Sequence, residues 1–198
     1  MKNKAKNNEM DIVFLLDRSG SMSGIEKDTI GGYNSYINSQ RGKNMKVTTI
    51  LFDGDYEVLY DRVDIDKVKK LTNKEYYVRG CTALLDAIGK TIQRIDKKNP
   101  NKVMFIITTD GYENSSRKYN KSQIKELIEC HKDWEFMYIG ANIDSYAEGS
   151  SIGISEDNIA NYKKSKFGVT KLFSALSSAS KCYYENDELD QSWKEELE

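Results

Sequence analysis

Residues 11–24 read DIVFLLDRSGSMSG, and this stretch decides the fold. Its first half is a short, nearly continuous apolar run, a pattern typical of a strand that is covered on both faces in a parallel sheet. Its second half holds a carboxylate, hydroxyls and glycines, which are typical of a loop. We therefore predict a buried strand that ends in a polar loop, and we expect the rest of the chain to hold and complete that loop.

The rest of the chain alternates strand and helix patterns. We predict further strands at residues 46–52, 56–60, 103–107, 134–140 and about 158–162, and helices at about 25–40, 66–71, 84–98, 144–150 and around Ile124 and Val169. Asp53 and Asp55 flank a glycine between two strand patterns, which favours a hairpin turn over a pair of metal ligands and makes the next strand an antiparallel edge strand. The alternation predicts an α/β fold: an open, doubly wound, mostly parallel sheet with helices on both faces.

Composition argues against several functional classes. The 198 residues are 38% hydrophobic, which is enough for one sizeable core. Lys+Arg 30 and Asp+Glu 31 leave a net charge of -1, so no overall field favours nucleic acid or an anionic membrane. No apolar run approaches the roughly 18 residues of a membrane span. Three widely spaced cysteines without a Cys-x-x-Cys pair favour a reduced, cytoplasmic protein.

We predict one domain over residues 10–182, preceded by a flexible lead-in at residues 1–9 and followed by an acidic tail at residues 183–198. The tail lacks an extended apolar face, so a mobile segment is the simpler interpretation. The alternative is a small helix that docks onto the domain, because Leu189, Trp193 and Leu197 recur at four-residue spacing.

Two of the predicted strands end in loops that carry an aspartate followed by glycine and hydroxyls. Asp17 follows the first strand, and Asp110 follows the strand at residues 103–107. Ligands of open α/β sheets bind beyond the carboxyl ends of the strands, at the point where the chain changes direction across the sheet. If these two strands flank that point, both carboxylates meet at one site.

The side chains around these aspartates supply oxygen donors. Ser19 and Ser21 follow Asp17 at two-residue spacing, and Gly20 lets the loop curl so that the carboxylate and both hydroxyls face inward. Thr82 is a further donor, just before a predicted helix. Hard oxygen donors predict Mg²⁺ or Mn²⁺ rather than zinc or copper. Because two carboxylates only neutralise a divalent ion, a water or a partner's Asp or Glu would supply one more oxygen.

Each of these residues also has a simpler interpretation. The loop at residues 17–21 would cap the following helix, and Thr82 would be the N-cap of its own helix. We interpret Cys81 as a small buried packing residue. The residues after Asp110, at 112–114, are either partner contacts at the rim of the site or ordinary loop residues.

These motifs resemble the von Willebrand factor type A (vWA) domain with its metal-ion-dependent adhesion site (MIDAS), in its intracellular bacterial or phage type. The family's Asp-x-Ser-x-Ser motif matches Asp17-Arg18-Ser19-Gly20-Ser21, its second-loop threonine matches Thr82, and its third-loop aspartate matches Asp110. The resemblance covers about residues 10–182 and implies a Rossmann-like fold. It also implies that Ser19, Ser21 and Thr82 bind the metal through their hydroxyls, that Asp17 and Asp110 balance its charge, and that a partner's carboxylate fills the open position.

Three functions remain open at this point. The first is a non-enzymatic, metal-dependent protein-protein interaction module that binds a partner's acidic residue through the cation. The second is a metal-dependent phosphatase or phosphotransferase at the same strand ends, but Ser19 stands where such folds often place a second aspartate, and there is no Gly-x-x-x-x-Gly-Lys loop. The third is a structural domain with a vestigial site. We favour the first, with no catalytic residue, no nucleic-acid or membrane partner, and no indication of oligomeric state.

Overall fold

The computed structural model describes residues 9–195 and 197. Its centre is a six-stranded sheet built from β1 (Met10–Asp17), β2 (Met45–Phe52), β3 (Tyr56–Asp64), β4 (Val103–Thr109), β5 (Trp134–Gly140) and β6 (Ile159–Asn161). The strand order is β3-β2-β1-β4-β5-β6, with β3 antiparallel at one edge and the other neighbours parallel. The predicted α/β fold class is confirmed.

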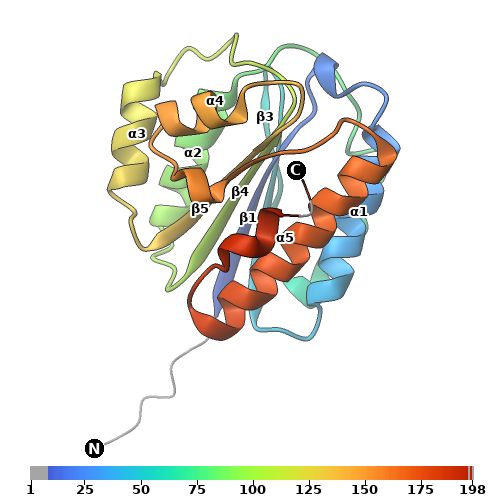
Figure 1. Cartoon of the computed structure of the whole chain (residues 1–198), viewed down its shortest axis with the longest axis vertical. Coiled ribbons are helices and arrows are strands. Elements are labelled where there is room, and N and C mark those ends of the chain that lie inside the picture. The colour runs from blue at the N-terminus through green and yellow to red at the C-terminus, as the bar shows by residue number, and fades with distance from the viewer. Residues whose placement is uncertain (1–8, 196, 198) are drawn as a thin grey trace, which may run out of the picture.

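Helices cover both faces of the sheet (Figure 1), and they are α1 (Glu26–Gln40), α2 (Leu84–Asp96), α3 (Lys121–Glu129), α4 (Ser145–Ser151) and α5 (Lys166–Asn186). Helices α1 and α5 lie on one face, and α2, α3 and α4 lie on the other. Successive side chains of β1 divide between the two layers. Phe14 and Leu16 join the cluster under α1 and α5, whereas Val13 and Leu15 join the cluster under α2. Burial on both faces explains why β1 is almost uniformly apolar.

The chain changes direction between β1 and β4. From β1 it moves outward to β2 and β3, and it then returns to pair β4 with the free side of β1. Leu16 is in register with Thr108, so the strands end together and the loops that follow them lie side by side. This is the switch point at which open α/β sheets bind ligands. The expectation that the loops after Asp17 and Thr109 meet there is confirmed.

Two predicted elements differ in extent. Strand β3 was expected at residues 56–60 but continues to Asp64 past a shift in register, where Arg62 has a φ of 51° and its Nε donates to Asp11 Oδ1 at 2.6 Å. The helix expected at 66–71 is only a 3-10 turn, η2 (Ile65–Lys67). Arg41 explains why it stops, since its guanidinium binds the backbone carbonyl groups that a longer helix would have used.

The C-terminal segment packs onto the domain. Helix α5 continues through residue 182 to Asn186, and a 3-10 turn, η4 (Gln191–Lys194), follows. Trp193 and Leu197 are each 6% exposed and belong to the core cluster under α5, and Trp193 Nε1 donates to the carbonyl of Asp157 at 3.0 Å. The docked alternative, rather than a mobile tail, therefore describes the part of this segment that the structure covers.

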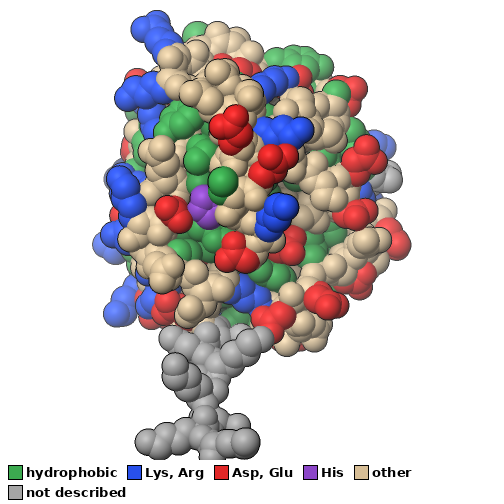
Figure 2. Space-filling model, turned by 90° about the vertical axis from the view of Figure 1, so that its left-hand side faces the viewer, with side chains coloured by type: hydrophobic (Ala, Val, Ile, Leu, Met, Phe, Trp, Pro, Cys, Tyr) green, Lys and Arg blue, Asp and Glu red, His purple; other side chains and the backbone are tan. Residues whose placement is uncertain are grey.

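The proposed lead-in lies outside the described residues except for Glu9, which pairs with Arg62 at 2.8 Å. The domain limits at residues 10 and 182 stay predictions. Within the described ranges, none of the helices is long and apolar enough to cross a membrane. Acidic and basic side chains are interspersed over the face of the molecule in Figure 2.

Candidate metal centre

Asp17 ends the buried strand β1, and its carboxylate is held by two hydrogen bonds. The backbone N–H of Ser19 donates to Oδ1 at 2.6 Å, and the hydroxyl of Thr109 donates to Oδ2 at 2.6 Å. The residue is fully buried, and this burial raises the pKa of the Asp17 carboxyl to about 6. A buried carboxylate that costs free energy to ionise calls for a compensating positive charge.

Hydroxyl groups of three other residues, carried by two loops, converge beside this carboxylate. The 3-10 turn η1 (Gly20–Met22) curls the loop so that the hydroxyls of Ser19 and Ser21 lie 2.9 Å apart. A Cβ atom at Gly111 would stand 3.0 Å from Ser21 Oγ, 3.0 Å from Thr82 Oγ1 and 3.7 Å from Ser19 Oγ. Three hydroxyls from the loops after β1 and before α2 therefore surround the glycine that follows β4.

Asp110 brings the second carboxylate to this edge of the sheet. Its Oδ2 lies 2.9 Å from the ammonium nitrogen of Lys164, while its Oδ1 is buried and has no hydrogen-bond partner among the described residues. A buried carboxylate oxygen without a partner is uncommon, and a water or an ion at this position would satisfy it. The same ammonium also donates to the backbone carbonyl of Ser21.

The arrangement fits a divalent cation. Its donors are two carboxylates and three hydroxyls, all hard oxygens of the kind that Mg²⁺ and Mn²⁺ prefer. The unsatisfied Oδ1 of Asp110 and the hydroxyls around Gly111 lie at the same strand ends. No group of three or more His, Cys, Asp or Glu within the described part of the chain is arranged to hold a metal, so hydroxyls have to complete any such site. Asp17, Ser19, Ser21, Thr82 and Asp110 are thus brought together as the sequence suggested, and their ligation of metal stays a prediction.

Glu113 and Asn114, which follow Asp110 in the chain, position the loop that carries Thr82. The side-chain oxygen of Asn114 accepts from Thr82 N at 2.9 Å, and Asn114 N donates to the Thr82 carbonyl at 3.0 Å. Glu113 Oε2 accepts from Leu85 N at 2.9 Å, in the first turn of α2. Glu113 and Asn114 therefore hold Thr82 against the loop that follows β4, and the Tyr112 side chain is 54% exposed. Contact of residues 112–114 with a partner stays a prediction.

Arg18 and Asp53 form a buried ion pair that anchors the first loop. Arg18 is fully buried, and its Nε lies 2.9 Å from Asp53 Oδ2, which also accepts from Arg79 Nε at 2.8 Å. The Oδ1 of Asp53 accepts from the backbone N–H of Asp55 at 2.6 Å within the β2–β3 turn. The hairpin interpretation of Asp53 is confirmed, and its carboxylate is occupied by two arginines instead of a metal.

One packing expectation is wrong. Cys81 was interpreted as a buried packing residue, but the structure leaves it exposed. The residue sits between Gly80, whose φ is 69°, and the buried Thr82. The turn that carries Thr82 inward leaves its neighbour on the outside.

Sequence reasoning missed two residues that contact the site. Thr109 donates to Asp17, and its place is visible only once β4 is known to run beside β1 in register. Lys164 reaches Asp110 and Ser21 from the connection between β6 and α5. No motif marks that lysine, because it stands far along the chain from both partners.

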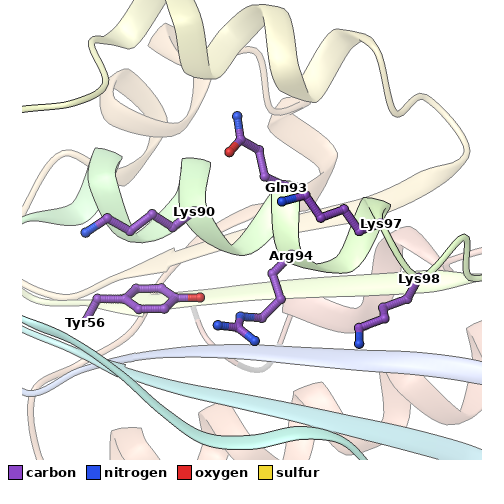
Figure 3. Close-up of a pocket in the computed structure, with 6 residues that line it drawn as sticks. All are labelled: Tyr56, Lys90, Gln93, Arg94, Lys97 and Lys98. Carbon is purple, nitrogen blue, oxygen red and sulfur yellow. The ribbon is translucent and has the colours of Figure 1, made fainter.

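A cavity of about 540 Å³ lies elsewhere, between β3 and the second half of α2 (Figure 3). Its lining residues are Tyr56, Lys90, Gln93, Arg94, Lys97 and Lys98. Four of these side chains are cationic and none is a carboxylate, so the cavity does not suit a divalent metal.

Several solved structures share the fold of the chain at low sequence identity. The chain resembles mussel byssus proximal thread matrix protein 1 with a zinc-occupied MIDAS motif (17% identity, TM-score 0.66, 87% of this chain and 46% of that one). It also resembles a von Willebrand factor type A protein from Catenulispora acidiphila (15% identity, TM-score 0.64, 87% and 42%) and the manganese-loaded Plasmodium vivax TRAP protein (17% identity, TM-score 0.57, 84% and 74%). The chain spans less than half the length of the first two proteins.

No curated protein sequence gives a significant match to the chain. The family model of the von Willebrand factor type A domain matches residues 11–175, which is most of the chain and includes all three loops of the candidate site. The strand order and the antiparallel edge strand agree with that match. The chain therefore belongs to the von Willebrand factor type A domain family.

Proposed function

We propose that the chain is a metal-dependent protein-binding module. The hydroxyls of Ser19, Ser21 and Thr82 bind a divalent cation, Mg²⁺ or Mn²⁺, and Asp17 and Asp110 balance its charge. The observation that carries this proposal is the convergence of the three hydroxyls around Gly111, next to a buried Asp110 oxygen that has no partner among the described residues. The zinc and manganese in two similar structures support a divalent ion.

When bound, the cation supplies a positive charge with a coordination position open to an anionic oxygen. The exposure of the hydroxyls defines the direction from which a ligand approaches, because the site lies at the ends of the buried strands β1 and β4. Ser21 is exposed there, whereas Ser19 and Thr82 are buried. An aspartate or glutamate on a partner protein is the group that fits this opening, and the proposal assigns no catalytic residue to the chain.

The rim of the site supports a protein partner. The large hydrophobic side chains that the structure leaves exposed are Tyr77 at 45%, Tyr112 at 54% and Phe167 at 70%. Tyr112 lies two residues after Asp110, Phe167 three after Lys164, and Tyr77 shortly before the Thr82 loop. The guanidinium groups of Arg18 and Arg79 lie 5.7 Å and 5.6 Å from the Tyr77 ring centre. Trp, Tyr and Arg are enriched among the residues that dominate binding energy at protein interfaces, and Tyr77, Tyr112 and Arg79, whose side chain is 40% exposed, are of this kind.

The first experiment measures Mg²⁺ binding by calorimetry for the native chain, for Asp17→Ala and for a control, Asp55→Ala. Asp55 is a matched control because its carboxylate is 78% exposed in the hairpin turn, outside the site. We expect the native chain and Asp55→Ala to bind the metal alike and Asp17→Ala to lose it. Equal affinity in all three proteins, or no binding in any, would contradict the proposal.

The second experiment tests the partner. The native chain is used as bait in an extract of its own cells, with and without a chelator, beside Asp17→Ala as bait. A partner that depends on the site is recovered only with the native chain and only with metal present. Recovery that is unchanged by chelation would instead support a structural domain with a vestigial site.

We also place the protein in the cytoplasm. The support is that Cys81, Cys130 and Cys182 are all free thiols. Fractionation of the native cells, with detection of the chain in each fraction, tests this location.

A further inference from the structure

Lys164 binds two of the three loops that form the metal centre. Its ammonium nitrogen lies 2.9 Å from Asp110 Oδ2 and also donates to the carbonyl of Ser21. The Asp110 side chain is 1% exposed and the Lys164 side chain 23%, so water screens this ion pair poorly. The carboxylate that would balance the charge of a metal is therefore already paired with a cation from the chain itself.

The segment that carries Lys164 is fixed at both ends. On one side, Tyr162 is buried and its N–H donates to the carbonyl of Gly140 at 2.9 Å, at the end of β5. On the other side, the hydroxyl of Ser165 caps α5 by accepting from Gly168 N at 3.1 Å. The connection from β6 to α5 thus passes the carboxyl end of β1 (Figure 1), and its anchors hold the ammonium over the site.

A divalent ion and this ammonium cannot share Asp110 without a penalty. Both are cations, and a metal held by the hydroxyls of Ser21 and Thr82 with Asp110 beside them would stand within a few ångströms of the ammonium. Like charges at such a separation repel strongly in a partly buried site. Each cation therefore weakens the binding of the other.

We propose that Lys164 is an internal competitor for the divalent cation and thereby sets the affinity of the metal centre. This inference rests on the proposed function, because it requires that the site binds a metal. A metal at the Asp110 Oδ1 that has no partner among the described residues would place a second cation against the carboxylate whose Oδ2 Lys164 already pairs with. The protein therefore needs a higher metal concentration than its five oxygen donors alone would require.

Calorimetry with Mg²⁺ compares the native chain with Lys164→Gln and Lys164→Ala. Lys163→Gln is the matched control, because Lys163 is the adjacent, exposed residue of the same segment. We expect both Lys164 variants to bind Mg²⁺ about tenfold more tightly or better, since a hydrogen bond between charged groups contributes roughly that factor to an equilibrium. Lys163→Gln should bind like the native chain.

A second measurement uses the native chain and so does not depend on how the variants fold. An amine-acylating reagent is applied with and without Mg²⁺, and mass spectrometry follows the rate of modification at Lys164 and Lys163. We expect Mg²⁺ to speed the reaction at Lys164, because repulsion by the metal weakens its contact with Asp110 and makes its amine more accessible, and to leave Lys163 unchanged.

The outcomes separate this inference from the proposed function. Metal that binds the native chain and the Lys164 variants with equal affinity, or a Lys164 reactivity that Mg²⁺ does not raise, would overturn the competitor role while leaving the metal centre intact. Metal that binds neither the native chain nor any variant would overturn both.

Discussion

At the scale of single residues, Asp17 belongs both to the buried strand β1 and to the proposed metal centre. Its carboxylate is buried under the loop, and burial is the main reason why its pKa is raised to about 6. Hydrogen bonds from Thr109 and Ser19 favour the ionised form, but they do not fully offset the loss of solvation. The residue therefore gains most from a cation placed next to it.

The raised pKa of Asp17 predicts how metal affinity depends on pH. A carboxyl binds metal in its ionised form, so the proton and the metal compete. We expect the Mg²⁺ affinity of the native chain to be nearly constant above about pH 7 and to fall by about tenfold per pH unit below about pH 6, whereas an ordinary aspartate would stay ionised down to about pH 4. Calorimetry across this pH range measures the Mg²⁺ affinity. An affinity that stays constant down to about pH 5 would contradict the role of Asp17.

The metal-free protein should respond to pH in the opposite sense. Because the folded-state pKa of Asp17 lies above the unfolded value of 3.8, the native state binds the proton more tightly than the unfolded chain does. The contribution of this carboxyl to the free energy of unfolding is therefore largest at low pH and is lost as the pH rises through about 6. A bound metal would restore that stability at neutral pH.

At the scale of elements, the site depends on three loops that approach one another around Gly111. This glycine needs no left-handed backbone, since its φ is not among the positive ones. Its absence of a side chain matters because a Cβ would come within 3.0 Å of two hydroxyls. The β4 loop can therefore close on the other two loops only if this position stays small.

Gly111→Ala should accordingly weaken metal binding without unfolding the protein. The methyl group would push Ser21 and Thr82 apart, so we expect Mg²⁺ affinity to fall by about tenfold or more, while metal-free stability changes by no more than about 1 kcal/mol. Gly31→Ala is the control, because nothing lies within 4 Å of its Cβ position on α1. Calorimetry and chemical denaturation measure the two effects. Unchanged affinity in Gly111→Ala would show that the hydroxyls do not act together.

The sequence predicted the elements that have a local pattern, but not the residues that reach the site through strand pairing or a distant loop. The strands and main helices were predictable because each carries its own local pattern, such as the apolar run that became β1. That Asp17, Ser19, Ser21, Thr82 and Asp110 lie together was predictable, because two of their loops follow strands and the third precedes a helix, while their binding of metal stays a prediction. Thr109 and Lys164 were not, because each reaches the site through strand register or a distant connection, neither of which leaves a local signal.

At the scale of the whole molecule, the sequence alone also could not decide whether the C-terminal segment packs onto the domain. Its four-residue spacing of apolar side chains indicated that it could dock, but whether a surface exists to receive it depends on packing elsewhere. The receiving surface is formed by α5 and the neighbourhood of β6: Trp193 donates to the carbonyl of Asp157, and Lys194 donates to the carbonyl of Ile159 at 3.1 Å. The segment thereby covers an edge of the core cluster.

If the docked C-terminal segment folds together with the domain, removing its largest side chain must destabilise the whole domain. Trp193 is 6% exposed, and its replacement by alanine removes both apolar burial and the hydrogen bond to Asp157. We expect Trp193→Ala to lower the free energy of unfolding by about 3 kcal/mol, as for other buried aromatic residues. Glu195→Ala, at an exposed position of the same segment, should change it by less than about 0.5 kcal/mol. Urea denaturation of the three proteins measures the difference, and equal midpoints would mean that the segment detaches in solution and that the domain is stable without it.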